Sequence, residues 1–136
     1  MSNTLENLLP HRPPMLWIRA LTRCADTEAT ATATFQEGDF AVQNDAVSET
    51  ALVECVAQTV AAAQGERARR SGKTAATVGG MLAAVTKFRI QAPAPVGKPL
   101  DIDVRELKRF GPMLLVFGEV KCEGELIASG QLSLYA

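Results

Sequence analysis

Residues 49–70 read ETALVECVAQTVAAAQGERARR, and this stretch decides the fold. It contains no proline, its one glycine is Gly65, and alanine is abundant, so it favours a helix. Ser48 is the expected N-cap, Glu49 suits the first turn, and residues 71–72 are the expected end. The central part, ALVECVAQTVAAA, is apolar on almost every side, which indicates a helix that is buried over most of its surface.

The sequence on both sides of this helix is typical of strands. Before it, residues 15–21 form an apolar run, and residues 27–35 read TEATATATF with the strict alternation of a strand. After it, Gly, Pro and charged turn residues separate four strand-like runs, at 78–90, 100–107, 113–122 and 126–135. Residues 36–48 are predicted to form a polar loop.

These elements predict an α+β fold in which an antiparallel sheet wraps around one long central helix. A single helix cannot cover both faces of a sheet, whereas a sheet curled around an apolar helix buries both elements. Residues 1–136 are expected to form a single domain, since the length suits one core and no linker or repeat is visible. The outer sheet edge invites pairing with a second copy, so we expect a homodimer.

Composition excludes several classes of function. The net charge of −1 and the pI near 5.8 give no case for binding nucleic acid. No apolar run approaches the roughly 20 residues that cross a bilayer, and the first residues do not resemble a secretory signal. The three cysteines are odd in number and lack metal-binding spacing, so free thiols in a reducing cytoplasm are expected. No metal, nucleotide or flavin site is visible.

Two polar residues interrupt the apolar helix. Glu54 and Gln58 are four positions apart, so they lie on one side of it. A carboxylate among apolar neighbours loses hydration and is suited to taking and returning a proton near neutral pH. The alternative is structural: Glu54 could pair with Gln58, with a backbone amide or with an arginine across a dimer interface.

Three stretches resemble a known family. Residues 9–16 read LPHRPPML, residues 52–58 read LVECVAQ, and residues 85–89 read VTKFR, with PVG following at 95–97. In this order they resemble the 3-hydroxyacyl-[acyl-carrier-protein] dehydratases of the hot-dog superfamily, in particular the divergent dehydratase-like proteins linked to aryl polyene and related lipid pathways. The resemblance covers nearly the whole chain and implies the hot-dog fold.

The resemblance also implies a reaction, the elimination of water from a (3R)-hydroxyacyl thioester in fatty acid or polyene-type lipid biosynthesis. In the family a loop histidine removes a proton from C2, and the helix glutamate protonates the departing hydroxyl. The two residues come from opposite subunits. No separate cofactor is needed, because the substrate is carried on the phosphopantetheine of an acyl carrier protein or coenzyme A. Carried over, Glu54 is the catalytic carboxylate and Gln58 its neighbour.

Several further residues are implied to bind substrate. Gly79 or Gly80 could line the tunnel where the thioester lies, and aromatic residues such as Trp17 and Phe40 are expected in the core or along this tunnel. Lys87 and Arg89 lie in a strand that flanks the family's active site. These two cations could meet an acidic carrier protein and the pantetheine phosphate.

This sequence departs from the family at the loop histidine. Residues 37–41 read EGDFA where the family has Gly-His-Phe-Pro, so Asp39 stands in the place of the histidine. Asp39 could act as the base in a paired-carboxylate site. The single histidine, His11, is a second candidate, although its place in the opening motif suggests a structural role. Cys55 points about 100° away from Glu54 around the helix and is expected to be a packing residue.

Three functions therefore stay open. The first is a dehydratase-like lyase with altered catalytic residues. The second is a hot-dog thioesterase in which Glu54 acts as nucleophile or as the base for a water. The third is a non-catalytic subunit that binds an acyl carrier or pairs with a paralogue, as a heterodimer or a higher oligomer.

Four cations lie at the tail of the helix: Arg67, Arg69, Arg70 and Lys73. They are expected to be solvated and to complement the helix dipole.

Overall fold

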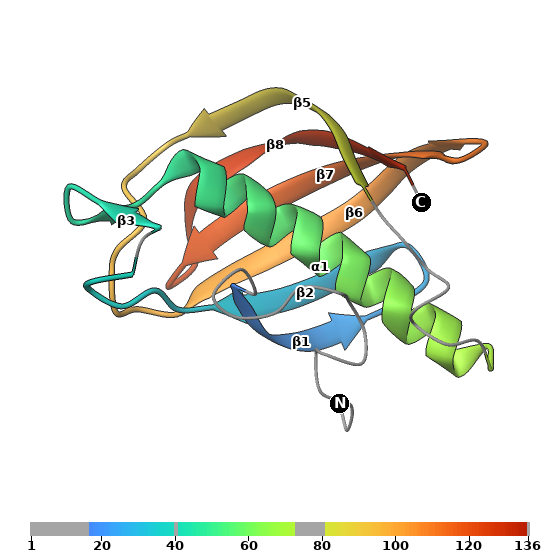
Figure 1. Ribbon diagram of the computed structural model, residues 1–136, viewed down its shortest axis with the longest axis horizontal. Helices are drawn as coiled ribbons and strands as arrows, with labels where there is room; N and C mark the ends of the chain where they lie inside the picture. The colour runs from blue at the N-terminus through green and yellow to red at the C-terminus, as the bar shows by residue number, and fades with distance from the viewer. Residues whose placement is uncertain (1–16, 40, 73–80, 136) are drawn as a thin grey trace.

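One long helix and one six-stranded sheet make up most of the chain (Figure 1). The computed structural model describes residues 17–39, 41–72 and 81–135. In chain order the elements are β1 (Ile18–Cys24), β2 (Glu28–Ala33), β3 (Val42–Gln43), β4 (Ala46–Val47), α1 (Glu49–Arg70), β5 (Met81–Ile90), β6 (Leu100–Phe110), β7 (Met113–Cys122) and β8 (Glu125–Tyr135). No helix among these residues is long and apolar enough to cross a membrane.

The sheet is antiparallel throughout, with the strand order β1-β2-β6-β7-β8-β5. Its strands alternate between buried and more exposed residues, most regularly in β7, where Leu114, Val116 and Val120 face inward. The helix α1 lies across the inner face formed by these residues (Figure 1). The predicted architecture, an antiparallel sheet wrapped around a central helix, is therefore confirmed.

The helix begins and ends where the sequence predicts. Its N-cap is Ser48, whose hydroxyl accepts a hydrogen bond of 3.2 Å from the backbone N–H of Ala51. Glu49 and Arg70 are its first and last residues. The predicted strand 113–122 is also confirmed to the residue, whereas the starts of the predicted strands 15–21 and 78–90 lie outside the described residues.

A glycine lets the helix approach the sheet closely. Gly118 lies on the inner face of β7, opposite Val56 of α1, and a Cβ atom at this position would overlap the side chain of Val56. Val56 is fully buried at this contact. The distance between helix and sheet is thus set by the absence of a side chain on β7.

The segment predicted as a polar loop contains a short hairpin. Strands β3 and β4 pair, and the two residues between them, Asn44 and Asp45, both have positive φ, at 53° and 62°. Two successive residues of this kind make the tight turn that joins hairpin strands, and Asn and Asp tolerate it better than most. Hydrogen bonds from Val47 to Ala94 and from Ser48 to Ala41 tie the hairpin to the body of the protein.

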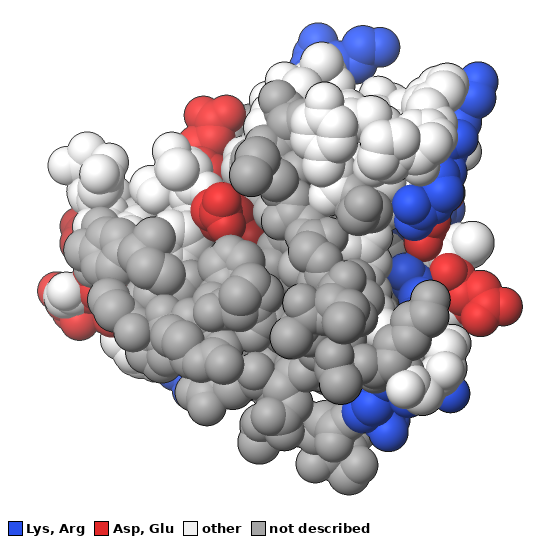
Figure 2. Space-filling view, turned by 45° about the vertical axis from the view of Figure 1, so that its right-hand side comes forward, with Lys and Arg blue, Asp and Glu red and all other residues white. Residues whose placement is uncertain are grey.

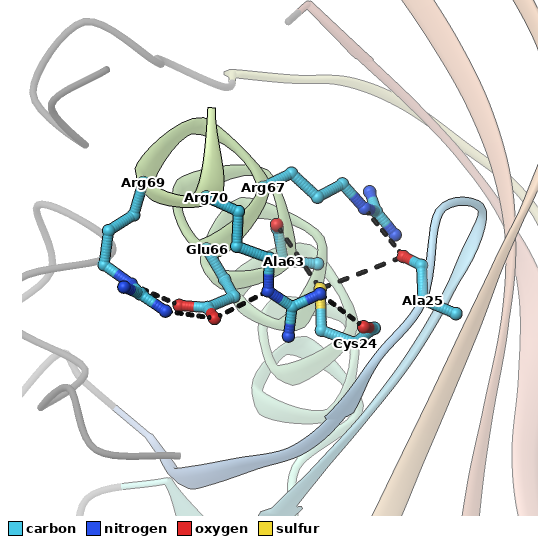
Figure 3. Close-up of polar contacts among 7 residues, drawn as sticks. All are labelled: Cys24, Ala25, Ala63, Glu66, Arg67, Arg69 and Arg70. Atoms are coloured by element: carbon cyan, nitrogen blue, oxygen red, sulfur yellow. Dashed lines mark hydrogen bonds and ion pairs between the residues drawn. The ribbon is translucent and has the colours of Figure 1, made fainter. Parts of the chain in front are cut away.

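The tail of α1 is only partly the solvated helix end that the sequence predicts. Glu66 is 1% exposed, and its carboxylate accepts hydrogen bonds from Arg69 at 2.8 and 2.7 Å and from Arg70 at 2.9 Å (Figure 3). These hydrogen bonds, led by those from Arg69, lower the pKa of Glu66 below its usual value although burial opposes the shift. Arg70 also donates to the carbonyl of Cys24 at the end of β1.

Arg67 binds the turn between β1 and β2. Its guanidinium donates to the carbonyls of Ala25 and Glu28, and it forms an ion pair of 3.0 Å with Glu106 of β6 (Figure 3 shows the bond to Ala25). The prediction therefore holds for Arg69 and Arg70, which are exposed in the last turn, but not for Arg67, because helical spacing does not reveal which sheet residues lie opposite. Lys73 lies outside the described residues.

We predict that Gly118→Ala lowers the free energy of unfolding by about 1–3 kcal/mol, since the added methyl group must displace Val56 or the helix. Urea denaturation measures this change. The double variant Gly118→Ala/Val56→Ala should lose less stability than the sum of its two single variants, because truncating Val56 makes room for the methyl group. Strict additivity would show that the close approach does not limit packing.

We predict that Glu66→Gln lowers the free energy of unfolding by about 1–2 kcal/mol at pH 7; the half-exposed arginines keep the effect modest. Glu28→Gln is the matched control, because its ion pair with Arg23 is exposed and should contribute little. The pKa of Glu66 is lowered in the folded state. The contribution of Glu66 to the free energy of unfolding is therefore complete at a pH above the usual glutamate pKa of 4.5, and it is lost as the pH falls through the folded-state pKa. Unfolding curves between pH 7 and 3 should therefore show wild type and Glu66→Gln converging.

Candidate functional site

A cavity of about 460 Å³ opens at the N-terminal end of α1. It lies among the first residues of the helix, the β3–β4 hairpin and the residue before β1. Its lining consists of Trp17, Ala41, Gln43, Asn44, Ser48, Glu49 and Thr50. The volume falls in the range of small-molecule sites, which is about 300–1,000 Å³.

Glu54 lies one helical turn beyond this cavity. It follows Thr50, which lines the cavity, by four positions, and so lies on the same side of α1. It is half-buried, whereas the next residues along the helix, Cys55 and Val56, are fully buried against the sheet. Val53 and Ala61 are also partly exposed, so Glu54 belongs to the side of the helix that the sheet does not cover.

Gln58 anchors the start of β1 to the helix. Its side chain is 1% exposed, and its carbonyl oxygen accepts hydrogen bonds from the backbone N–H groups of Trp17, at 2.9 Å, and of Ile18, at 3.3 Å. Sequence reasoning placed Gln58 beside Glu54 as a member of the catalytic set. The structure adds that it positions Trp17, a wall of the cavity. A buried glutamine needs such partners, but its sequence position does not identify them.

The loop that carries the family's histidine does lie beside the start of the helix. Ala41 is buried, lines the cavity, and accepts a hydrogen bond from Ser48 at 2.8 Å. Asp39 is exposed, and its carboxylate accepts a hydrogen bond of 2.7 Å from the backbone N–H of Gln36. Asp39 thus closes a local turn. Phe40 lies outside the described residues, as do His11, Gly79 and Gly80.

The two predicted phosphate-binding cations lie on the edge strand β5. A bulge between Thr86 and Arg89 interrupts the pairing of β5 with β8, and Lys87 within it adopts a φ of 55°. Both Lys87 and Arg89 are exposed, while Phe88 between them is partly buried over Gly130 of β8. A bulge of this kind redirects side chains and often occurs near binding sites.

The cysteine beside Glu54 is a packing residue. Cys55 is fully buried, and burial raises the pKa of its thiol far above the usual value. Thiolate chemistry at this position is therefore disfavoured, as the sequence predicts. Within the described part of the chain no three His, Cys, Asp or Glu side chains are grouped as metal ligands would be.

Comparison with known proteins identifies the family. The sequence profile of the ApeP-like family, described as ApeP dehydratase, matches residues 3–136. The chain belongs to the ApeP-like dehydratase family. No match is found among curated proteins.

Several solved structures share the fold of this ApeP-like protein. The dehydratase heterocomplex ApeI:P from Xenorhabdus doucetiae matches with a TM-score of 0.88 and 22% identity, over 99% of this chain and 91% of that chain. The PaaI protein of the E. coli phenylacetic acid degradation operon matches with a TM-score of 0.67 and 11% identity, over 85% and 81% of the two chains. A hypothetical thioesterase with coenzyme A from Streptococcus pneumoniae TIGR4 matches with a TM-score of 0.65 and 6% identity, over 85% and 86%.

These comparisons confirm the predicted hot-dog fold and the predicted dehydratase family. The chain is a divergent, polyene-type dehydratase-like protein, as the three sequence stretches indicate. The thioesterase neighbours share its fold but give no further support to the thioesterase alternative, since their identity is low.

We predict that Cys55 resists alkylation in the native protein, because it is fully buried and its thiol pKa is raised. Cys24 is only partly buried, so it should react with iodoacetamide first, although burial also raises its pKa. Peptide mass spectrometry after timed labelling at pH 8 distinguishes the two. Rapid modification of Cys55 without unfolding would contradict the structure of this helix.

Proposed function

We propose that this ApeP-like protein removes water from 3-hydroxyacyl thioesters, with Glu54 as the group that protonates the leaving hydroxyl. The observation that carries the proposal is the position of Glu54, half-buried on the uncovered side of an otherwise apolar helix and one turn from a cavity. The substrate chemistry follows from the dehydratase family. The cavity next to Glu54 would admit the 3-hydroxyacyl end of the thioester.

The reaction needs two proton-transferring groups. A base removes the C2 proton, the electrons of that C–H bond form the C2=C3 double bond, and the C3–O bond breaks. Protonated Glu54 gives its proton to the departing oxygen, which leaves as water. The products are a 2-enoyl thioester and water, and proton exchange between the two groups restores the starting states.

We propose that the base comes from another chain. The one histidine of this chain, His11, belongs to the opening motif, and the loop position of the family's histidine is occupied by Asp39, which closes an exposed turn. In the family the two catalytic groups come from opposite subunits. A second hot-dog chain with an intact loop histidine would therefore complete a site around Glu54. The homologous ApeI:P dehydratase is a heterocomplex, which supports this division.

The edge strand β5 is the proposed pairing surface. No strand in the described ranges pairs with its outer side, and its side chains Val85 and Ile90 are each 42% exposed. An apolar, unpaired edge invites a further strand. Pairing here would continue the sheet into the partner, whether that is a second copy, as in a homodimer, or a paralogue.

An acyl carrier protein is the proposed substrate carrier, with coenzyme A as the alternative source of the same phosphopantetheine. Lys87 and Arg89 are exposed on β5, where they would meet an acidic carrier or the phosphate. Figure 2 shows lysine and arginine side chains along the right-hand edge of one face, with some acidic side chains among them. The proposed location is the cytoplasm.

We predict that Glu54→Gln lowers the rate of dehydration by about 10²–10⁴-fold, the usual contribution of a positioned acid. The protein is assayed with 3-hydroxyacyl thioesters on pantetheine, coenzyme A and carrier protein, alone and together with a hot-dog partner that has the loop histidine. Ultraviolet absorbance reports the 2-enoyl product, and a thiol reagent reports hydrolysis. We expect enoyl product only with the partner.

The control is Glu125→Gln, an exposed carboxylate at the start of β8, which should leave the rate unchanged. If Glu54→Gln keeps its activity within a factor of a few, Glu54 is not the acid. Free thiol in place of enoyl product would identify a thioesterase. Full activity without the partner would show that this chain supplies its own base.

A further inference from the structure

We propose that Trp17 limits the size of the acyl group that the site accepts, and that Gln58 is the positioning residue that holds Trp17 in place. This inference rests on the proposed function, because it concerns the cavity beside Glu54. It assigns a role in specificity to a residue outside the catalytic set.

Trp17 is the one large apolar side chain that lines the cavity in the described parts of the chain. The other lining residues are small or polar, from Ala41 and Ser48 to Gln43 and Glu49. An acyl chain in this cavity finds its main apolar contact on the indole ring, and the ring is also the bulkiest obstacle to a longer chain.

Contacts on two sides fix Trp17. Its backbone N–H donates to the buried side-chain oxygen of Gln58 at 2.9 Å, and the next residue, Ile18, is 2% exposed and donates to the same oxygen. The indole ring meets the buried ring of Phe35 edge-on, with centroids 6.2 Å apart and an interplanar angle of 64°. The two hydrogen bonds fix the backbone from which the indole projects, and moving the ring would break its contact with Phe35, so the indole forms a wall of the cavity.

Trp17 has one contact at Gln58 and another at the cavity, on either side of the helical turn that carries Glu54. Its backbone is bound at Gln58, while its side chain lines the cavity together with Thr50, two helical turns away. Glu54 lies midway between these two residues on the same side of α1. Trp17 thus has contacts on both sides of the turn that carries Glu54, and we infer that the acyl carbons next to the reacting C2–C3 bond lie against the indole.

The test compares acyl chain lengths. Wild type, Trp17→Leu and Trp17→Phe, each together with the histidine-bearing partner, are assayed with 3-hydroxyacyl pantetheine thioesters of increasing length. We expect Trp17→Leu to raise kcat/KM for the longest substrates relative to the shortest by about tenfold or more, since single methylenes in such pockets change discrimination by about 10–200-fold. The change in kcat/KM with Trp17→Leu should come mainly from KM. Trp17→Phe should shift the preference for acyl chain length less than Trp17→Leu does.

Gln58 is tested with a conservative variant. Gln58→Leu removes the acceptor oxygen and should broaden the chain-length preference, whereas Gln58→Glu keeps an acceptor and should restore it. Trp17 is the single tryptophan, so its fluorescence in the isolated chain reports this position alone. Binding of a non-hydrolysable acyl pantetheine should change the emission of wild type, and free Gln58→Leu should show red-shifted emission.

An unchanged chain-length preference in both Trp17 variants, with dehydration intact, overturns this inference and leaves the proposed function standing. Absence of enoyl product from the wild-type complex overturns the proposed function instead. If Trp17→Leu fails to fold by circular dichroism, the milder Trp17→Phe variant and the wild-type fluorescence titration decide. Emission that does not respond to bound acyl pantetheine also overturns the inference.

Discussion

Val56 of α1 is seated over Gly118 of β7, and this contact fixes how deeply the helix lies in the sheet. An apolar helix gains stability in proportion to the area it buries, roughly 25 cal/mol per Å². One curled sheet can cover only part of the helix surface, so a side remains that carries Val53, Glu54 and Ala61. The deep contact on one side therefore leaves the carboxylate partly exposed on the other, one helical turn from a cavity.

The edge strand β1 depends on polar contacts with the helix at both of its ends. Among the described strands it pairs with β2 alone, and its register has two irregularities, so the sheet holds it weakly. At its start the oxygen of Gln58 binds two backbone N–H groups. At its end the thiol of Cys24 donates to the carbonyl of Ala63, and Arg70 donates to the carbonyl of Cys24. The first of these attachments forms a wall of the candidate site, and the second closes the far end of the core.

Sequence reasoning succeeded where local physics decides the structure. The helix bounds follow from capping and from the absence of proline, and β7 follows from its alternation, so both were predicted to the residue. Glu54 was singled out because a carboxylate within the apolar central part of a helix is unusual. The partners of Gln58 and Arg67 were not predictable, because they lie about 40 positions away in the sequence. The partners of Glu66, by contrast, are three and four positions away and follow helical spacing. The β3–β4 hairpin was missed because Asn44-Asp45 is a weaker turn signal than Asn-Gly.

In the loop before the helix, Asp39 has a structural role at the position where the family has its histidine. Asp39 accepts a hydrogen bond from the backbone of Gln36 and stabilises the turn, so the loop keeps its place beside Ser48 without a histidine. Glu54 is a half-buried carboxylate on the side of the helix that the sheet does not cover, one turn from the cavity. A structural Asp39 together with a carboxylate at position 54 is what the proposed two-chain active site requires, with the base supplied by the other chain.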